Sequence, residues 1–281
     1  MSVNFSVNTN TAASNILQNL YYVQNQVNTS YSQLSSGNRI NNAADDPAGY
    51  AISQQMQQNV NGLNTAVQNS QNGISLIQTA SGAMQQVGSI LQTLNTLAVE
   101  AANGTQNSAD LTNLQTEWSA LTNQISTINA NTQFNTISLF SGNAVSSGGL
   151  TLQVGAQENQ VLSFSTHSLS LGALKIDLTA NNVAISSQVS AQAAISSIGN
   201  AISLLNNYEA NLGSVQDQLN YTVSNLQNAA TNLQNAEGTI TNTNMAQAYT
   251  TFTQDQVLTQ VGTAMLSQAQ QQPAAILKLL S

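Results

Sequence analysis

The sequence predicts a mainly α-helical protein: a bundle of long coiled-coil helices with a small β-hairpin subdomain and paired terminal helices. Over long stretches, apolar residues recur at alternating spacings of three and four, which is typical of helices that pack along a narrow seam. The composition agrees, because 41% hydrophobic residues with only 5% aromatic ones suit thin aliphatic seams better than one thick core. A central stretch lacks the helical spacing and predicts the β-hairpins.

The first helix is expected over residues 11–34, since the first ten residues carry no helical pattern. One apolar seam follows it with a single gap at Ser30. The seam consists of Ala13, Ile16, Leu20, Val23, Val27 and Leu34. The breaker Ser35-Ser36-Gly37 then ends the helix.

Two adjacent aspartates lead into the next helix. Asp45 and Asp46 precede Pro47, and an Asp near the N-cap with Pro in the first turn is a typical helix start. Capping and the helix dipole explain these paired carboxylates better than catalysis does. Arg39 is the only arginine, and a structural salt bridge is favoured over a binding role for it.

Two helices are expected next, over residues 47–102 and 107–130, with a turn at Asn103-Gly104 between them. Trp118, the only tryptophan, lies on the seam of the second helix and is expected in the core. The bundle-core positions expected in the two helices are Leu91, Leu94, Leu114, Trp118, Leu121 and Ile125.

The first of these helices contains two Asn-Gly pairs, Asn61-Gly62 and Asn72-Gly73, which elsewhere would indicate turns. The apolar spacing continues through both, so the helix is expected to continue, although each Gly costs about 1 kcal/mol relative to Ala. The seam is expected to slip by three residues between Met84 and Val87.

Residues 134–180 predict two small hairpins or a small β-subdomain, because short β-type runs alternate with Gly, Asn and Ser clusters. The runs are Ile137–Phe140, Leu150–Val154, Val161–Ser165 and Leu174–Leu178. Four titratable residues lie in this stretch, namely Glu158, His167, Lys175 and Asp177. A single His without a suitably spaced acidic partner is a surface residue by default, so no metal or catalytic site is expected there.

Another long helix is expected over residues 183–237. Its seam, from Ile195 to Leu233, keeps the alternating spacing throughout, and only Glu209 and Gln216 interrupt it. At ~1.5 Å per residue this seam forms a rod of roughly 58 Å, which needs partner helices of similar length. Its expected bundle-core positions are Ile202, Leu205, Leu212, Leu219 and Leu226.

The last helix is expected from about Thr243 to the C-terminus, with Tyr249, Phe252, Leu258, Val261 and Met265 sharing one side. The two terminal helices have thin seams and together bury too little to offset the entropy of ordering them. We therefore expect them to pack against copies from neighbouring subunits. The expected assembly seams are Ile16, Leu20, Val23, Val27, Leu34, Phe252, Leu258, Val261, Met265 and Leu277.

Charge and composition argue against several classes of function. Three Lys and Arg against 11 Asp and Glu give a formal charge of −8, which does not favour nucleic acid or an anionic membrane as a partner. Neither a membrane-spanning helix nor an N-terminal signal segment is expected. Without Cys, with one His and without the nucleophile, zinc, phosphate-loop or dinucleotide motifs, we expect no enzyme, cofactor or metal.

Three stretches resemble bacterial flagellin. LSSGNRINNAADDPAGYAIS, residues 34–53, resembles its N-terminal signature, including Arg39, Asp45 and Asp46. LQTLNTLAVEAANGT at 91–105, together with TQFN at 132–135, resembles the blocks that follow, and residues 245–280 resemble its C-terminal helix. The resemblance covers roughly residues 1–140 and 185–281 in the family's order, which implies a short form lacking the variable outer domains.

The resemblance implies a domain organisation and a set of partners. Residues 1–34 with 245–281 would form an inner terminal domain, 35–44 and 238–244 connecting spokes, and 45–237 a rod-like domain with the β piece at about 134–180. The protein would be a structural subunit that self-assembles into the extracellular flagellar filament for motility. The flagellar export apparatus, a chaperone of the C-terminal helix, the filament cap and the hook-junction proteins would be its partners.

Two alternatives stay open at this point. A hook–filament junction protein shares the terminal helices, although the run ADDPAGYAIS favours flagellin. An enzyme-bearing flagellin would need a catalytic insert, and the Ser-, Gly- and Asn-rich β piece has no metal motif.

Overall fold

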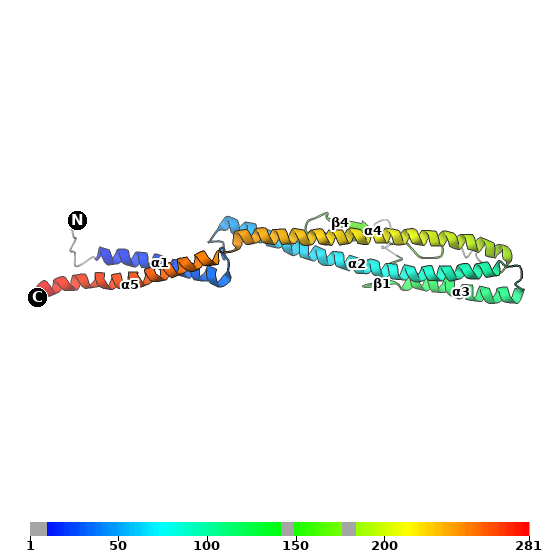
Figure 1. Ribbon diagram of the computed structural model, residues 1–281, viewed down its shortest axis with the longest axis horizontal. Coiled ribbons are helices and arrows are strands. Elements are labelled where there is room, and N and C mark those ends of the chain that lie inside the picture. Colours follow the sequence, from blue (N-terminus) through cyan, green and yellow to red (C-terminus); the bar gives the residue numbers. More distant parts are fainter. Residues whose placement is uncertain (1–9, 142–148, 176–183, 281) are drawn as a thin grey trace. The chain divides into compact units, whose positions relative to one another are not determined.

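The computed structural model describes residues 10–141, 149–175 and 184–280, with side chains as far as residue 271. Five helices occur in these ranges (Figure 1): α1 (Thr11–Ser36), α2 (Pro47–Ala101), α3 (Ser108–Asn131), α4 (Gln188–Thr241) and α5 (Met245–Leu280). Four short strands lie between α3 and α4: β1 (Gln133–Phe134), β2 (Ile137–Ser138), β3 (Leu150–Gln153) and β4 (Val161–Phe164). The predicted fold class is confirmed.

The chain divides into two compact units. The terminal unit comprises residues 1–58 and 232–281, and the bundle unit comprises residues 59–231. The helices α2 and α4 each begin in one unit and end in the other, so each unit contains part of both.

One apolar core joins α2, α3 and α4 in the bundle unit. Of the core positions expected from sequence, seven are buried within this core: Leu91, Leu94, Trp118, Ile125, Leu205, Leu212 and Leu219. Leu114, Leu121 and Ile202 are half-buried against it, and Leu226 is also buried. On the α4 seam, Glu209 and Gln216 are half-buried, which suits the edge of a core.

The buried side of α2 does not slip between Met84 and Val87, so that prediction is wrong. Buried residues alternate at spacings of four and three from Gly73 to Ala101. They are Gly73, Ile77, Ala80, Met84, Val87, Leu91, Leu94, Ala98 and Ala101. The slip arises only if large side chains alone are counted, because the small residue Ala80 continues the seam.

The four strands form two antiparallel hairpins. In the first, β1 pairs with β2 through a two-residue turn in which Asn135 and Thr136 both have positive φ, 47° and 65°. Two positive-φ residues are the pattern of a type I′ turn, whose twist matches that of the flanking strands. In the second, β3 pairs with β4 in the register Leu150 to Phe164 and Gln153 to Val161.

The expected strands at 137–140 and 174–178 are shorter or absent in the described part of the chain. Leu139 and Phe140 are fully buried beyond the end of β2 and therefore pack as core rather than pair as strand. Leu174 is buried in a turn, and residues 176–178 lie outside the described residues.

The second hairpin rests on α2, which explains the two glycines inside that helix. A Cβ on Gly73 would overlap the Leu152 side chain of β3, and one on Gly62 would come within 2.8 Å of the Ala156 Cβ. The Asn69 side chain donates a hydrogen bond to the Gln153 carbonyl, 3.2 Å away, on the same side of α2. Glycine is therefore present where the hairpin approaches the helix most closely.

Both ends of α4 differ from the sequence-based expectation by four residues or more. The helix α4 begins at Gln188 rather than at residue 183, and it continues past Gly238 to Thr241. At Thr241 the backbone bonds to another segment instead of continuing the helix: the Arg39 N–H donates to the Thr241 carbonyl at 2.6 Å, and the Thr243 N–H donates to the Gly37 carbonyl.

Candidate assembly surface

The first helix, α1, and the last helix, α5, lie side by side and run antiparallel (Figure 1). Asn10 acts at one end of the pair: its Oδ1 accepts the Ala13 N–H at 2.9 Å and caps α1, while its Nδ2 donates to the Ala269 carbonyl at 2.9 Å. At the other end the Thr243 N–H donates to the Gly37 carbonyl at 3.0 Å. The pair is thus held by hydrogen bonds at both ends.

The inner side of α1, which faces α5, is the seam predicted from sequence. Ser30 on this side is buried, and the apolar residues are half-buried. These are Ala13, Ile16, Leu20, Val23, Val27 and Leu34. The inner side of α5 is made mostly of small residues, with Ala248 and Ala269 buried. Gly262 lies so close to α1 that a Cβ there would meet the Leu20 Cδ1 at 3.0 Å.

The apolar residues expected to share one side of α5 are divided between two sides. Phe252 is half-buried toward α1, whereas Leu258, Val261 and Met265 are 45%, 52% and 54% exposed. At about 100° per residue, positions six apart lie on different sides of a helix, so Phe252 and Leu258 cannot share a seam. The side chain of Leu277 lies outside the described residues.

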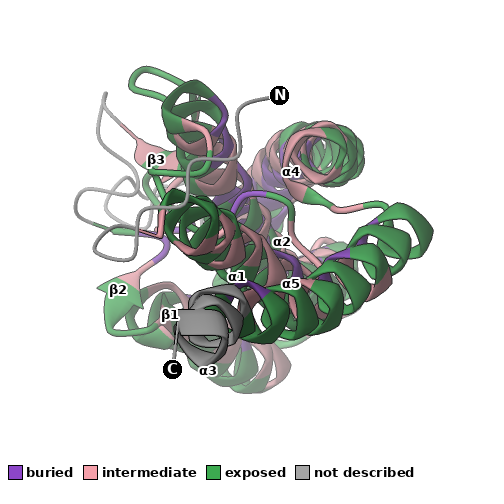
Figure 2. Ribbon diagram, turned by 90° about the vertical axis from the view of Figure 1, so that its left-hand side faces the viewer, coloured by how far each residue is buried: buried purple, intermediate pink, exposed green. Residues whose placement is uncertain are grey.

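An outer face of α5, defined as Val257, Leu258, Val261 and Met265, is apolar and exposed. Spacings of three and four bring these side chains together on one side of the helix. The other helix of the pair adds apolar surface of its own, since Tyr21, Tyr22 and Tyr31 of α1 are each 65% exposed. Exposed residues cover most of both helices (Figure 2).

The helix pair carries almost no charge. The sequence of α1 contains no Asp, Glu, Lys, Arg or His, and that of α5 contains only Asp255 and Lys278 as charged residues. Asp255 lies on the inner side, is 9% exposed, and its Oδ2 is buried without a hydrogen-bond partner among the described residues. As far as residue 271, the outer face of α5 is therefore both apolar and uncharged.

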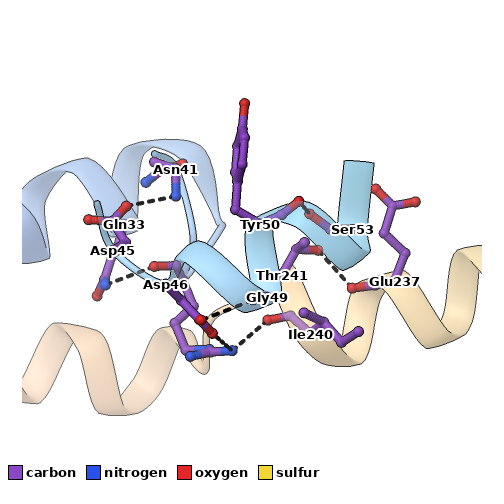
Figure 3. Close-up of polar contacts among 11 residues, drawn as sticks. Gln33, Asn41, Asp45, Asp46, Gly49, Tyr50, Ser53, Glu237, Ile240 and Thr241 are labelled. Carbon is purple, nitrogen blue, oxygen red and sulfur yellow. Dashed lines mark hydrogen bonds and ion pairs between the residues drawn. The ribbon is translucent and has the colours of Figure 1, made fainter. Parts of the chain in front are cut away.

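The segment between α1 and α2 is tied to the end of α4 by the residues of the sequence signature (Figure 3). The Arg39 guanidinium donates to the Ile240 carbonyl at 2.8 Å and lies 4.0 Å from the Asp46 carboxylate. Asp46 caps α2 by accepting the Gly49 N–H at 2.9 Å. Asp45 accepts the backbone N–H groups of Asn41 and Asn42, each at 2.9 Å. A partly exposed ion pair contributes little to stability. The hydrogen bonds that Arg39 donates to the backbone carbonyls of Ile240 and Thr241 therefore hold most of the connection.

The titratable residues of the β piece do not converge. The His167 ring stacks on Tyr208 of α4, with ring centroids 3.9 Å apart and planes inclined by 13°. Glu158 and Lys175 are exposed, and Asp177 lies outside the described residues. Within residues 10–141, 149–175 and 184–280, no three His, Cys, Asp or Glu side chains group as metal ligands would.

In the same ranges, no helix combines the length and the hydropathy needed to cross a bilayer.

Sequence reasoning missed two residues of the terminal pair. It did not identify the double role of Asn10, and it did not place Asp255 on the inner side of α5. The spacing could have revealed Asp255, because Ala248 and Phe252 precede it by seven and three residues and so share its side of the helix.

Comparison with known proteins identifies the family. The family model described as "Bacterial flagellin N-terminal helical region" matches residues 7–145, and the model described as "Bacterial flagellin C-terminal helical region" matches residues 195–280. A flagellin of Halalkalibacterium halodurans is 40% identical over 274 residues, which are 98% of this chain and 99% of that protein. The chain belongs to the bacterial flagellin family.

Two further relatives agree with this assignment. A flagellin of Bacillus subtilis is 38% identical over 301 aligned residues, covering 98% of this chain and 99% of that protein. The flagellar filament 30.7 kDa core protein of Treponema maltophilum is 34% identical over 265 residues, 91% of this chain and 93% of that protein. Because the two flagellins align with this one almost from end to end, its length is consistent with a short form.

The flagellin is a structural protein, a subunit of the bacterial flagellar filament that serves motility. Filaments formed by members of this family are extracellular. The resemblance found in the sequence is thereby confirmed.

Proposed function

We propose that the outer face of α5 and the exposed tyrosines of α1 become buried against other copies of this flagellin when the filament forms. The observation that supports this proposal is an exposed, uncharged apolar face on a helix whose opposite side already packs on α1. Burying a fully exposed side chain of this kind contributes about 1.5–3 kcal/mol, and roughly half of that remains available here because each of the four is about half exposed. Four such residues on one face still supply a substantial driving force for association.

Assembly and ordering of the terminal helices are coupled in this proposal. In α1, Ser30 is the buried side chain and the apolar seam residues are half-buried, so the isolated pair has a thin core. Neighbouring copies that bind only the ordered helices stabilise them by mass action. The filament therefore completes a fold that one subunit alone supports weakly.

The remaining parts of the proposal rest on the flagellin family. Residues 1–34 with 245–281 form the inner domain, 35–44 and 238–244 the spokes, and 45–237 the rod domain. The chain passes through the flagellar export apparatus unfolded, with its C-terminal helix held by a chaperone, and polymerises under the filament cap, beyond the hook-junction proteins. It acts outside the cell and has no enzymatic activity.

The test replaces Val261 by Gln, which keeps a good helix former but puts an amide on the outer face of α5. Since Val261 is 52% exposed in the subunit, the fold should be unaffected. The expected result is a critical concentration for polymerisation raised about tenfold or more. The lost apolar burial adds to the ~1–3 kcal/mol cost of burying an unpaired amide, and about 1.4 kcal/mol corresponds to a factor of ten. Sedimentation of seeded polymerisation reactions measures it.

The matched control is Val189→Gln in α4, where the same change is made at a valine that is 78% exposed in the bundle unit. Its critical concentration should stay near that of the unaltered protein. An unchanged critical concentration for Val261→Gln would overturn the proposed interface.

A further inference from the structure

The chain contains three Asn-Gly pairs, at Asn61, Asn72 and Asn103, and this dipeptide has a specific reactivity. The backbone nitrogen of the residue after Asn can attack the side-chain Cγ, forming a C–N bond and releasing the side-chain nitrogen as ammonia. Water then opens the resulting succinimide ring at either carbonyl and gives aspartate or isoaspartate. Gly favours the attack because it has no side chain to obstruct it and its backbone rotates freely.

Two of the pairs lie inside α2, where the helix prevents this attack. In an α-helix the N–H of each interior residue donates to the carbonyl four residues earlier, so the nitrogens of Gly62 and Gly73 are engaged and held away from the preceding side chain. Both glycines also lie under the β3–β4 hairpin, next to Ala156 and Leu152. Reaction at either site requires the helix to open locally.

The third pair lies in the turn between α2 and α3, outside any helix. Asn103 and Gly104 are both exposed, and the Gly104 N–H has no recorded acceptor in the described part of the chain. The Asn103 Oδ1 accepts the Thr105 N–H at 3.3 Å, so the side chain lies along the backbone that follows it. The surroundings of Gly104 are open, since a Cβ there would find only the Gln188 Nε2, at 3.8 Å.

We propose that Asn103 is a site of spontaneous deamidation in the folded protein, and that Asn61 and Asn72 are protected. Conversion places a new negative charge three residues before Gln106, whose N–H donates to the Asn103 carbonyl. The isoaspartate product also inserts a methylene group into the main chain at the α2–α3 turn. Because water is the only co-reactant, the modification accumulates with the age of each subunit.

The experiment incubates the full-length folded protein at mildly alkaline pH and follows the three asparagines by peptide mass spectrometry. Cleavage after Glu100 and Glu117 releases the segment that contains Asn103, and chromatography separates aspartate from isoaspartate. Conversion at Asn103 should be at least about tenfold faster than at Asn61 or Asn72, the factor that even a small helix-opening free energy imposes. In denaturant the three rates should converge.

Gly104→Ala is the matched variant, because the open surroundings accept a methyl group. It should slow conversion at Asn103 and leave the circular dichroism unchanged. Equal rates at the three sites in the folded protein would overturn the proposal. So would conversion at Asn103 that is as fast in Gly104→Ala as in the unaltered chain.

Discussion

Asp255 is a buried acid in a helix pair that is otherwise nearly free of charge. It faces α1, which contributes no charged residue, and its Oδ2 has no hydrogen-bond partner in the described part of the chain. A buried polar group without a partner costs about 1–3 kcal/mol, and more when it is charged. This residue therefore weakens the contact between α1 and α5 in the free subunit.

Replacing Asp255 by Ala is expected to stabilise the terminal pair by about 1–3 kcal/mol, because it removes the unpartnered oxygen and adds helix propensity. Ala also matches the small residues Ala248 and Ala269 on the same side of α5. Slower proteolytic cleavage within α1 and α5 measures the change. Asp217→Ala, at an exposed acid of α4, is the control and should give only the propensity gain. Equal cleavage rates for the two variants would contradict this account of Asp255.

At the scale of single elements, small residues decide where helices and hairpins meet. Gly62 and Gly73 admit the β3–β4 hairpin to α2, and Gly262 admits Leu20 to α5. Gly73 also lies near the bundle core, since a Cβ there would meet the Leu219 Cδ1 at 3.3 Å. Glycines of this kind cannot accept a methyl group without displacing a neighbour.

Gly73→Ala is therefore expected to destabilise the bundle unit by about 1–3 kcal/mol, because overpacking outweighs the gain in helix propensity. Gly213→Ala in α4 is the matched control: its Cβ has open space, so it should stabilise by about 0.5–1 kcal/mol. Denaturant unfolding followed by the fluorescence of Trp118, which is fully buried, measures both. Stabilisation by Gly73→Ala equal to that by Gly213→Ala would show that the hairpin does not rest on this glycine.

Large apolar residues on long helices were predictable from sequence, and small ones were not. The spacing from Ile195 to Leu233 predicts the α4 seam because mostly large aliphatic residues recur along it and only Glu209 and Gln216 interrupt them. Leu205, Leu212 and Leu219 are indeed buried. Most of the inner side of α5 escaped prediction because, apart from Phe252 and Leu266, it consists of Ala, Gly, Thr and a single Asp, and such residues give no hydrophobic period. Likewise, the slip expected in α2 disappears once Ala80 is counted.

The polar contacts of the connecting segment were only partly predictable. Asp46 next to Pro47 predicts a helix cap from local sequence alone, and the structure shows that cap. The Arg39 contact with the Ile240 carbonyl joins residues 201 positions apart, so no local pattern could indicate it.

At the scale of the whole molecule, the scarcity of charge and the exposed α5 face point to association through apolar contacts. The chain has 5% charged residues, so few ion pairs are available to join subunits. The terminal helices instead present Val, Leu and Met side chains that one subunit leaves exposed. We propose that other copies of the same flagellin complete the packing of these helices.

Amide hydrogen exchange of α1 and α5, compared between the free subunit and the assembled filament, tests this claim most directly. We expect fast exchange in both helices of the free subunit and strong protection in the filament, because assembly supplies the missing packing. Within the bundle unit, the amides of α4 around Leu212 and Leu219 should be well protected in both states and serve as the internal reference. Equal protection of α1 and α5 in the free subunit and in the filament would contradict the account.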